Sequence, residues 1–115
     1  MNSWSIIQTD TFARWYAALD VAAREDIYRT ILILKEFGPS LGRPYADTVA
    51  GSRHKNMKEL RVQSRGRPFR IFFAFDQKRN GVLLIGGKKT GDKRFYERMV
   101  VIAERLLDRY MEDCR

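Results

Sequence analysis

Two arginines of one predicted hairpin are the residues of this sequence best placed to bind an anion. The stretch from Lys58 to Lys93 contains three runs of apolar, β-branched or aromatic residues, separated by two short turns rich in Gly, Arg and Asn. This pattern predicts a three-stranded antiparallel meander. If residues 64–67 form the first loop, counting outward pairs Arg61 with Arg70. Like charges directly opposite one another cost some fraction of ~1 kcal/mol, so we expect an anion between the two guanidiniums.

A second group of cations precedes the last predicted helix, in the segment GGKKTGD over residues 86–92. Asp92 is the expected N-cap, and the unpaired N–H groups of a helix N-terminus attract anions. The glycine spacing differs from that of a phosphate-binding P-loop, which excludes that motif. Tyr96 follows in the first turn, beside the core residue Phe95, and either packs there or joins the site. The cations that make this end of the helix a predicted anion site are Lys88, Lys89, Lys93 and Arg94.

Basic residues are concentrated in the same part of the chain. The net charge is +8, yet residues 53–94 alone hold thirteen Lys and Arg residues against three acidic ones. The rest of the chain therefore carries a slight negative charge. A focused positive field attracts polyanions, and in a cytoplasm the commonest of these is nucleic acid. The alternative is a charged surface that serves only solubility.

The flanking segments predict the elements that hold these residues in place. We expect a strand over residues 3–8 as an added member of the sheet, then a helix after Thr9-Asp10. A second helix, capped by Asp20, ends at Gly38-Pro39 and packs on the first as an antiparallel hairpin. The Gly, Pro, Ser and Asp content of residues 40–56 predicts a surface loop that could contain one short turn of helix. The last helix has an apolar stripe of Phe95, Met99, Ile102, Leu106 and Tyr110.

Alternation along the strands assigns their faces. Leu60 and Val62 share one face with the apolar set Phe69, Ile71, Phe73 and Phe75. Arg61 and Arg70 share the other face with Phe72 and Ala74. The third strand, residues 81–88, is apolar almost throughout, as expected of a strand covered on both sides. Counting from a turn at residues 77–80 places Gly87 opposite Arg70, where the glycine either leaves open space beside the guanidinium or marks a bulge or the end of the strand.

The remaining features exclude several classes of protein. At 115 residues the chain is expected to form a single domain, over residues 1–115. Cys114 is the one cysteine, so we expect neither disulfides nor a metal site. The N-terminal segment has no signal-peptide pattern and no run is long enough to span a membrane, so we expect a cytoplasmic protein. His54, flanked by Arg53 and Lys55, has no partner that the sequence identifies, and is either a solvated loop residue or a functional one.

Three segments together resemble the phage-derived HigB branch of the RelE/HigB toxin superfamily: NMKELRVQ, GRPFRIFFAFD and LLIGGKKTGDKRFYERM. The resemblance spans most of the chain. It implies an α+β fold of the RelE type, with an N-terminal strand and helical hairpin packed on an antiparallel sheet and a C-terminal helix. It also implies an endoribonuclease that cleaves translated mRNA in the ribosomal A site and is neutralised by a cognate helix-turn-helix antitoxin. Such an enzyme transfers phosphate to the neighbouring 2′-hydroxyl and requires no metal ion or cofactor.

The resemblance also assigns roles to residues. Arg70 matches the strand arginine that holds the scissile phosphate, and Lys89, or Lys88 in a shifted register, matches a second basic residue. Tyr96 falls at an aromatic position used by some members, and Arg61 lies beside the family's basic positions. These four residues, Arg70, Lys89, Tyr96 and Arg61, form the predicted catalytic set. The predicted RNA-binding set is Lys58, Arg65, Arg67, Lys88, Lys93, Arg94 and His54.

The chain departs from its relatives on one strand, where they carry two lysines that alternate toward the active face. Here the residues are Met57, Lys58 and Glu59, and Lys58 shares a face with Leu60. Glu59 could replace the missing base, or could pair with Arg61. This departure keeps a second hypothesis open, a module or inactive remnant that binds RNA or the ribosome without cleavage. A third hypothesis is a phage-derived protein whose basic face binds an acidic protein partner.

Overall fold

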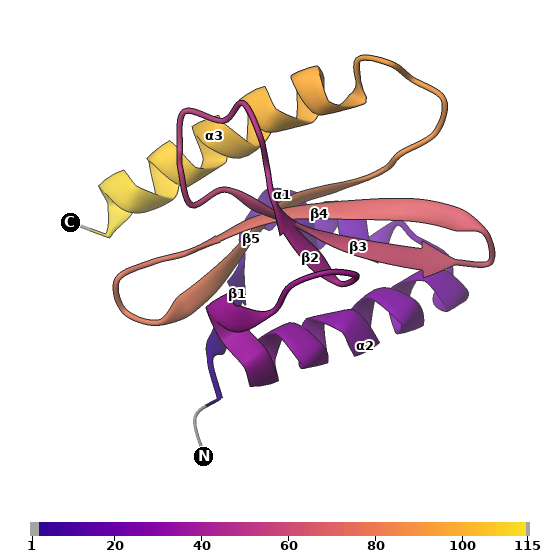
Figure 1. The fold of residues 1–115 in the computed structure, drawn as a ribbon, viewed down its shortest axis with the longest axis horizontal. Coiled ribbons are helices and arrows are strands. Elements are labelled where there is room, and N and C mark those ends of the chain that lie inside the picture. The colour runs from indigo at the N-terminus through magenta and orange to yellow at the C-terminus, as the bar shows by residue number, and fades with distance from the viewer. Residues whose placement is uncertain (1–2, 115) are drawn as a thin grey trace.

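The computed structural model describes residues 3–114, which form one five-stranded sheet and three α-helices (Figure 1). The strand order is β1-β5-β4-β3-β2, with β1 parallel to β5 and every other neighbouring pair antiparallel. This confirms the predicted α+β class, with the N-terminal strand as a member of the sheet. In chain order the elements are β1 (Ser5–Gln8), α1 (Asp10–Ala17), α2 (Val21–Phe37), a 3-10 turn (Gly38–Ser40), β2 (Ala46–Thr48), β3 (Lys58–Ser64), β4 (Arg67–Phe75), β5 (Asn80–Lys88) and α3 (Phe95–Asp113).

Helices cover both faces of the sheet. In Figure 1, α3 lies on one side and α2 on the other. The predicted N-caps of α1 and α2 are confirmed. Thr9 Oγ1 accepts a hydrogen bond from the backbone N–H of Phe12 at 3.0 Å, and Asp20 Oδ1 accepts one from the backbone N–H of Ala23 at 2.9 Å. The helices α1 and α2 follow one another on the same face, but α1 packs mainly on β5 and α2 mainly on β3. The predicted helical hairpin is therefore held together chiefly through the sheet.

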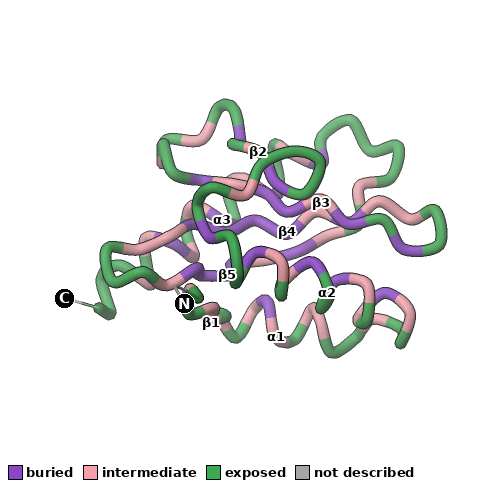
Figure 2. The backbone as a smooth tube through the Cα atoms, turned by 60° about the horizontal axis from the view of Figure 1, so that its bottom comes forward, coloured by how far each residue is buried: buried purple, intermediate pink, exposed green. Residues whose placement is uncertain are grey.

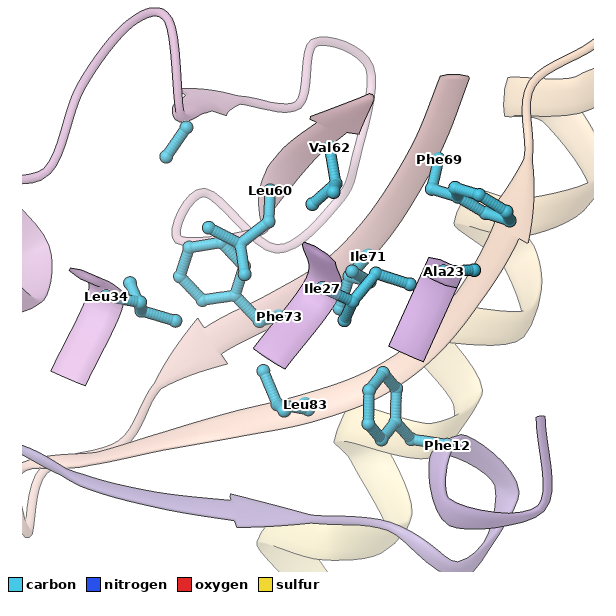
Figure 3. Packing of buried hydrophobic residues seen from close by; sticks show 11 residues of the cluster. Phe12, Ala23, Ile27, Leu34, Leu60, Val62, Phe69, Ile71, Phe73 and Leu83 are labelled. Atoms are coloured by element: carbon cyan, nitrogen blue, oxygen red, sulfur yellow. The ribbon is translucent and has the colours of Figure 1, made fainter. Parts of the chain in front are cut away.

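The larger core lies between the sheet and the helices α1 and α2. Figure 3 shows Ile27 and Leu34 of α2 and Phe12 of α1 in contact with side chains of β3, β4 and β5. In Figure 2 the buried segments follow the strands, whereas the loops are exposed. The β3 and β4 residues in this core belong to the face that alternation predicts, and they are Leu60, Val62, Phe69, Ile71 and Phe73. The second core, beneath α3, takes the alternate residues Phe72 and Ala74.

The first hairpin has the predicted register with a shorter loop. Ser64 pairs with Arg67, so only Arg65 and Gly66 form the connection, both with positive φ, at 51° and 76°. Two positive φ values in succession are what a two-residue type I′ turn requires, and its twist matches that of the strands. The pairing then runs outward to place Arg61 opposite Arg70, as predicted.

The second hairpin reaches the predicted pairing of Arg70 with Gly87 by a different path. Near the turn the predicted register is wrong by one residue, and a bulge between Phe72 and Phe73 restores it. The bulge leaves Leu84 as the extra residue of β5, and its carbonyl accepts a hydrogen bond from Thr9 Oγ1 at 2.6 Å.

The prediction of open space beside Arg70 at Gly87 is also wrong. A Cβ atom there would lie 3.0 Å from Phe95 Cε1 and 3.0 Å from Met99 Cε, so the first turns of α3 cover this position.

Three further expectations require correction. Residues 40–56 are not loop throughout, because Ala46–Thr48 forms the edge strand β2 on β3. With only three residues, β2 is too short for alternation to distinguish it from loop. The last helix begins at Phe95, not at the Asp92 cap, and no side chain caps it. Asp92 Oδ1 instead accepts from the backbone N–H of Arg94 at 2.9 Å in a preceding turn. Ile102 is exposed, since the stripe turns toward Ala103 and Leu107.

Candidate active site

Arg61 and Arg70 lie side by side on the face of the sheet that α3 only partly covers. Adjacent antiparallel strands bring them directly opposite one another. The side chain of Arg61 is 34% exposed and that of Arg70 is 14% exposed, so both are restrained yet reachable from solvent. This is the arginine pair that the sequence predicts.

The anion between the two arginines is the carboxylate of Glu59, whose side chain is only 5% exposed. Glu59 Oε2 lies 3.1 Å from Arg61 Nη2, which confirms the predicted Glu59–Arg61 pairing. Its other oxygen, Oε1, lies 3.7 Å from Arg70 Nε. A buried carboxylate is costly unless it is paired and hydrogen-bonded, and here both guanidiniums contribute to that pairing. The two arginines therefore carry their own counter-charge.

Tyr96, from the first turn of α3, completes what we call the arginine cluster (Glu59, Arg61, Arg70 and Tyr96). Its hydroxyl donates to Glu59 Oε1 at 2.7 Å and accepts from Arg70 Nε at 3.3 Å. Burial, followed by the hydrogen bond to Glu59, raises the pKa of Tyr96 above its ordinary value, despite the opposing effect of Arg70. At neutral pH the phenol is therefore a proton donor. The sequence left open whether Tyr96 packs or joins the site, and the structure brings it to the arginines.

The two arginines of the cluster border a shallow depression of about 310 Å³, which is lined by Pro44, Tyr45, Arg61, Val62, Gln63 and Arg70. Asp47 of β2 lies beside it and contacts Arg61 Nη2 at 3.4 Å. Arg70 Nη1 donates to the backbone carbonyl of Phe69 at 3.1 Å. Within residues 3–114, Arg70 Nη2 has no hydrogen-bond partner, so Arg70 retains donors for a ligand in the depression.

Comparison with known proteins places this chain in a family. Residues 14–108 match the family model described as phage derived protein Gp49-like. The chain belongs to this Gp49-like family. It is 39% identical over 108 residues to "Putative toxin HigB3" of Mycobacterium tuberculosis, with 93% of each chain covered. It is 40% identical over 104 residues to "Putative toxin HigB2" of the same organism, which covers 89% of this chain. The match spans only 52% of the length of HigB2.

Solved structures confirm the RelE-like fold of this Gp49-like chain. A mutant of the Escherichia coli toxin RelE in the free state superposes with a TM-score of 0.64 at 10% identity, over 90% of this chain and 97% of that one. The toxin–antitoxin complex RelBE2 of Mycobacterium tuberculosis gives 0.59 at 13% identity, over 76% and 100%. At such low identities these likenesses establish the fold alone. Together with the relatives named HigB, they confirm the resemblance that the sequence motifs indicate.

The structure separates the predicted RNA-binding cations of the Gp49-like chain into two groups. The first group makes no ion pair with any described residue, and consists of Arg65 at the hairpin tip, Lys88 at the end of β5, and Lys93 and Arg94 just before α3, all exposed. Lys89 joins it from the catalytic set, with Nζ 5.6 Å from the centroid of the Tyr96 ring. These cations remain available for phosphate contacts.

The second group is engaged elsewhere. Arg67 forms an ion pair with Asp20 at 2.8 Å, and Lys58 Nζ donates to the carbonyl of Pro39 at 3.3 Å. Lys58 lies on the α2 side of β3, as alternation predicts, and so it does not reach the arginine cluster.

His54 also lies outside the cluster and has a partner that the sequence did not reveal. Its Nε2 lies 2.7 Å from Asp108 Oδ1 on α3, and Arg53 contacts the same carboxylate. Arg53 also reaches Glu104 at 3.6 Å, so this group ties the loop before β3 to α3. We call Arg53, His54, Glu104 and Asp108 the Asp108 clamp.

Sequence reasoning missed Tyr45 and Asp47 because both fell in the segment taken as loop. The one available signal was the alternation of these two residues with the buried Ala46. In the part of the chain that the structure describes, no group of three His, Cys, Asp or Glu residues could hold a metal ion. No helix within residues 3–114 is both long and apolar enough to cross a membrane.

Proposed function

We propose that this chain is the toxin of a toxin–antitoxin system, and that it acts as a ribosome-dependent endoribonuclease on translated mRNA in the cytoplasm. The observation that carries the proposal is the arginine cluster, in which two facing arginines adjoin a protonated tyrosine at the edge of an open depression. The relatives named HigB2 and HigB3 support the first part of the proposal, that the chain is a toxin. A cognate antitoxin of the helix-turn-helix type is the expected partner.

In the proposed reaction the 2′-oxygen attacks phosphorus while the bond from phosphorus to the 5′-oxygen breaks, which leaves a 2′,3′-cyclic phosphate. Arg70 and Arg61 hold the phosphate oxygens, a task that suits the planar fork of a guanidinium, and Lys89 adds a further cation. Because the arginines stabilise the charged intermediate, the scheme needs no metal ion.

The proton transfers fall to Glu59 and Tyr96. Tyr96 donates its proton to the departing 5′-oxygen, since its raised pKa keeps the phenol protonated. Glu59 accepts the proton of the 2′-hydroxyl, because it is the carboxylate in contact with the arginine pair, whereas Lys58 lies on the other face. The hydrogen bond from Tyr96 to Glu59 Oε1 then provides the path by which Tyr96 regains a proton.

The ribosome supplies what the cluster lacks. The chain has a single histidine, and this residue is engaged in the Asp108 clamp, so no histidine pair assists the transfer. Positioning of the message by the ribosome would compensate for the weak intrinsic chemistry. The exposed cations between β5 and α3 would bind ribosomal RNA, through contacts that weaken as salt is raised.

A second function is favoured by one observation, the carboxylate of Glu59 between the arginines. A site that supplies its own anion could bind RNA or the ribosome and block translation without cutting the message. The two functions differ in whether new message ends form.

Mapping of mRNA 5′ ends after a short pulse of expression tests the proposal. We expect wild type to produce new cuts within translated regions, and Arg70→Ala to lower their number by at least about 100-fold and to relieve growth arrest. Arg29→Ala is the matched control, because Arg29 is exposed on α2 and, among the described residues, forms an ion pair with Asp26 alone. Growth arrest without new ends would support the binding function, and full toxicity of Arg70→Ala would contradict the site.

A further inference from the structure

Two of the other side chains that line the depression, Tyr45 and Gln63, are left uncommitted by the fold. Tyr45 is 41% exposed, and no aromatic or cation–π contact joins its ring to another described residue. Gln63 is exposed, and within residues 3–114 its amide makes no hydrogen bond. Both line the same depression as Arg61 and Arg70. A single exposed tyrosine is common on protein surfaces, but Tyr45 is exposed in the same depression as a pair of arginines that can bind an anion.

The backbone fixes both residues relative to the arginines. The carbonyl of Tyr45 accepts a hydrogen bond from the backbone N–H of Arg61 at 2.8 Å, which continues the pairing of β2 with β3. Alternation then puts Tyr45 on the same face as Asp47, whose carboxylate contacts Arg61. Gln63 follows Arg61 by two residues on β3 and shares its face. The aromatic ring, the amide and the guanidiniums therefore adjoin one another on rigid strands.

This combination fits a nucleotide better than a simple anion. Guanidiniums bind phosphate oxygens, an aromatic ring with a free face stacks on a base, and an amide offers both a donor and an acceptor to the base edge. An acidic peptide would use the cations alone and would gain nothing from the free ring face. The excess positive charge of residues 53–94 favours the same ligand, single-stranded RNA.

We propose that Tyr45 stacks on a nucleobase next to the phosphate held by Arg61 and Arg70, and that Gln63 hydrogen-bonds the edge of that base. The inference rests on the proposed function for the identity of the phosphate site. The proposed contacts determine which nucleotide of the message lies at the site. They would therefore also produce a base preference at the cut. Tyr45 and Gln63 are thus specificity residues, distinct from the groups that transfer protons.

Binding of a fluorescent RNA to the purified protein tests the stacking contact. The probe is a short single-stranded RNA with 2-aminopurine, a base whose fluorescence is quenched by stacking, and with 2′-O-methyl riboses that prevent cleavage. We expect wild type and Tyr45→Phe to quench the probe equally, because both rings stack. Tyr45→Leu should abolish the quench and weaken affinity about 5- to 150-fold. Tyr28→Leu is the matched control, since Tyr28 is exposed on α2, away from the depression.

The inference and the proposed function fail in different ways. Equal quench and affinity for Tyr45→Leu and wild type, or no quench by wild type, would overturn the stacking contact even if wild type cuts mRNA. A quench that depends on Tyr45, in a protein that never cuts mRNA, would uphold the contact and remove the nuclease. An acidic peptide that binds with the same dependence on Tyr45 would also overturn the assignment to RNA. Thermal unfolding of Tyr45→Leu, expected to match wild type, verifies that the fold is retained.

The role of Gln63 has a separate readout. We expect Gln63→Ala to leave the quench intact and to flatten the base composition around cut sites in the mRNA map. An unchanged composition in a variant that cuts as often as wild type would overturn the base-edge contact alone.

Discussion

The arginine cluster and the Asp108 clamp contain similar chemical groups in different surroundings. The cluster has one carboxylate, two arginines and Tyr96, whereas the clamp has two carboxylates, one arginine and His54. The carboxylate of Glu59 is 5% exposed, whereas that of Asp108 is 41% exposed. Solvent screens the Arg53–Asp108 pair of the clamp, whose side chains are 56% and 41% exposed, so this pair mainly joins two segments of chain. Burial in the cluster raises the pKa of Tyr96, which keeps the phenol protonated. It also means that each buried charge is costly unless its partner of opposite charge is present.

Removal of the buried carboxylate is the strongest test of this difference. Glu59→Ala leaves Arg61 and Arg70 facing each other without their counter-charge, and breaking such a buried pair costs several kcal/mol. We expect a loss of about 3 kcal/mol in the free energy of unfolding, at the lower end of that range because Arg61 also contacts Asp47. Urea unfolding of Glu59→Ala and Asp108→Ala provides the measurement. Comparable losses in the two variants would contradict the distinction between cluster and clamp.

A subtler substitution separates charge from shape. Glu59→Gln retains an oxygen that can accept from Tyr96 but removes the negative charge. Because Glu59 helps to raise the pKa of Tyr96, we expect that pKa to fall in Glu59→Gln. The shift can be measured by NMR titration of ¹³C-labelled tyrosine, with Tyr96→Phe to assign its signal among the five tyrosines. An unchanged Tyr96 titration would mean that burial alone sets the proton affinity.

The same comparison shows what sequence could and could not predict. Alternation and the centre of the first turn were enough to place Arg61 opposite Arg70 and to assign both faces of the first hairpin, because side-chain period and hairpin geometry are local properties. The contact between Tyr96 and Glu59 joins residues 37 positions apart, and the pair of His54 and Asp108 spans 54. Both depend on how α3 crosses the sheet.

The first residue and the orientation of α3 could also not be predicted from the sequence. The Asp92 pattern resembles an N-cap, yet Asp92 forms a turn with Arg94 and the helix begins at Phe95. Tyr96 could therefore not be assigned between core and site from its spacing. Edge strand β2, with three residues, gave too short a pattern to distinguish it from loop, and Tyr45 and Asp47 were missed with it.

The clamp makes the smallest predicted contribution, and one with a defined dependence on pH. Hydrogen bonds from Arg53 and then His54 lower the pKa of Asp108 from 3.8 to about 2. A carboxyl whose pKa is lower in the folded state stabilises the fold above its unfolded pKa, and this stabilisation is lost as pH falls through the folded value. The melting temperature of wild type should therefore exceed that of Asp108→Asn slightly at pH 7, and the difference should shrink between about pH 4 and pH 2.

The dependence of stability on salt concentration distinguishes the exposed ion pair of Asp108 from a buried one. At 1 M salt the Debye length falls to about 3 Å, so the difference between wild type and Asp108→Asn at pH 7 should also decrease. Asp113→Asn is the control, because this exposed carboxyl at the end of α3 forms no ion pair with any described residue, and its effect should be near zero throughout. A difference for Asp108→Asn that persists at pH 2 and in high salt would show that the clamp acts through packing. In that case the loop before β3 would be held as firmly as the arginine cluster, and the contrast in exposure would not account for their different roles.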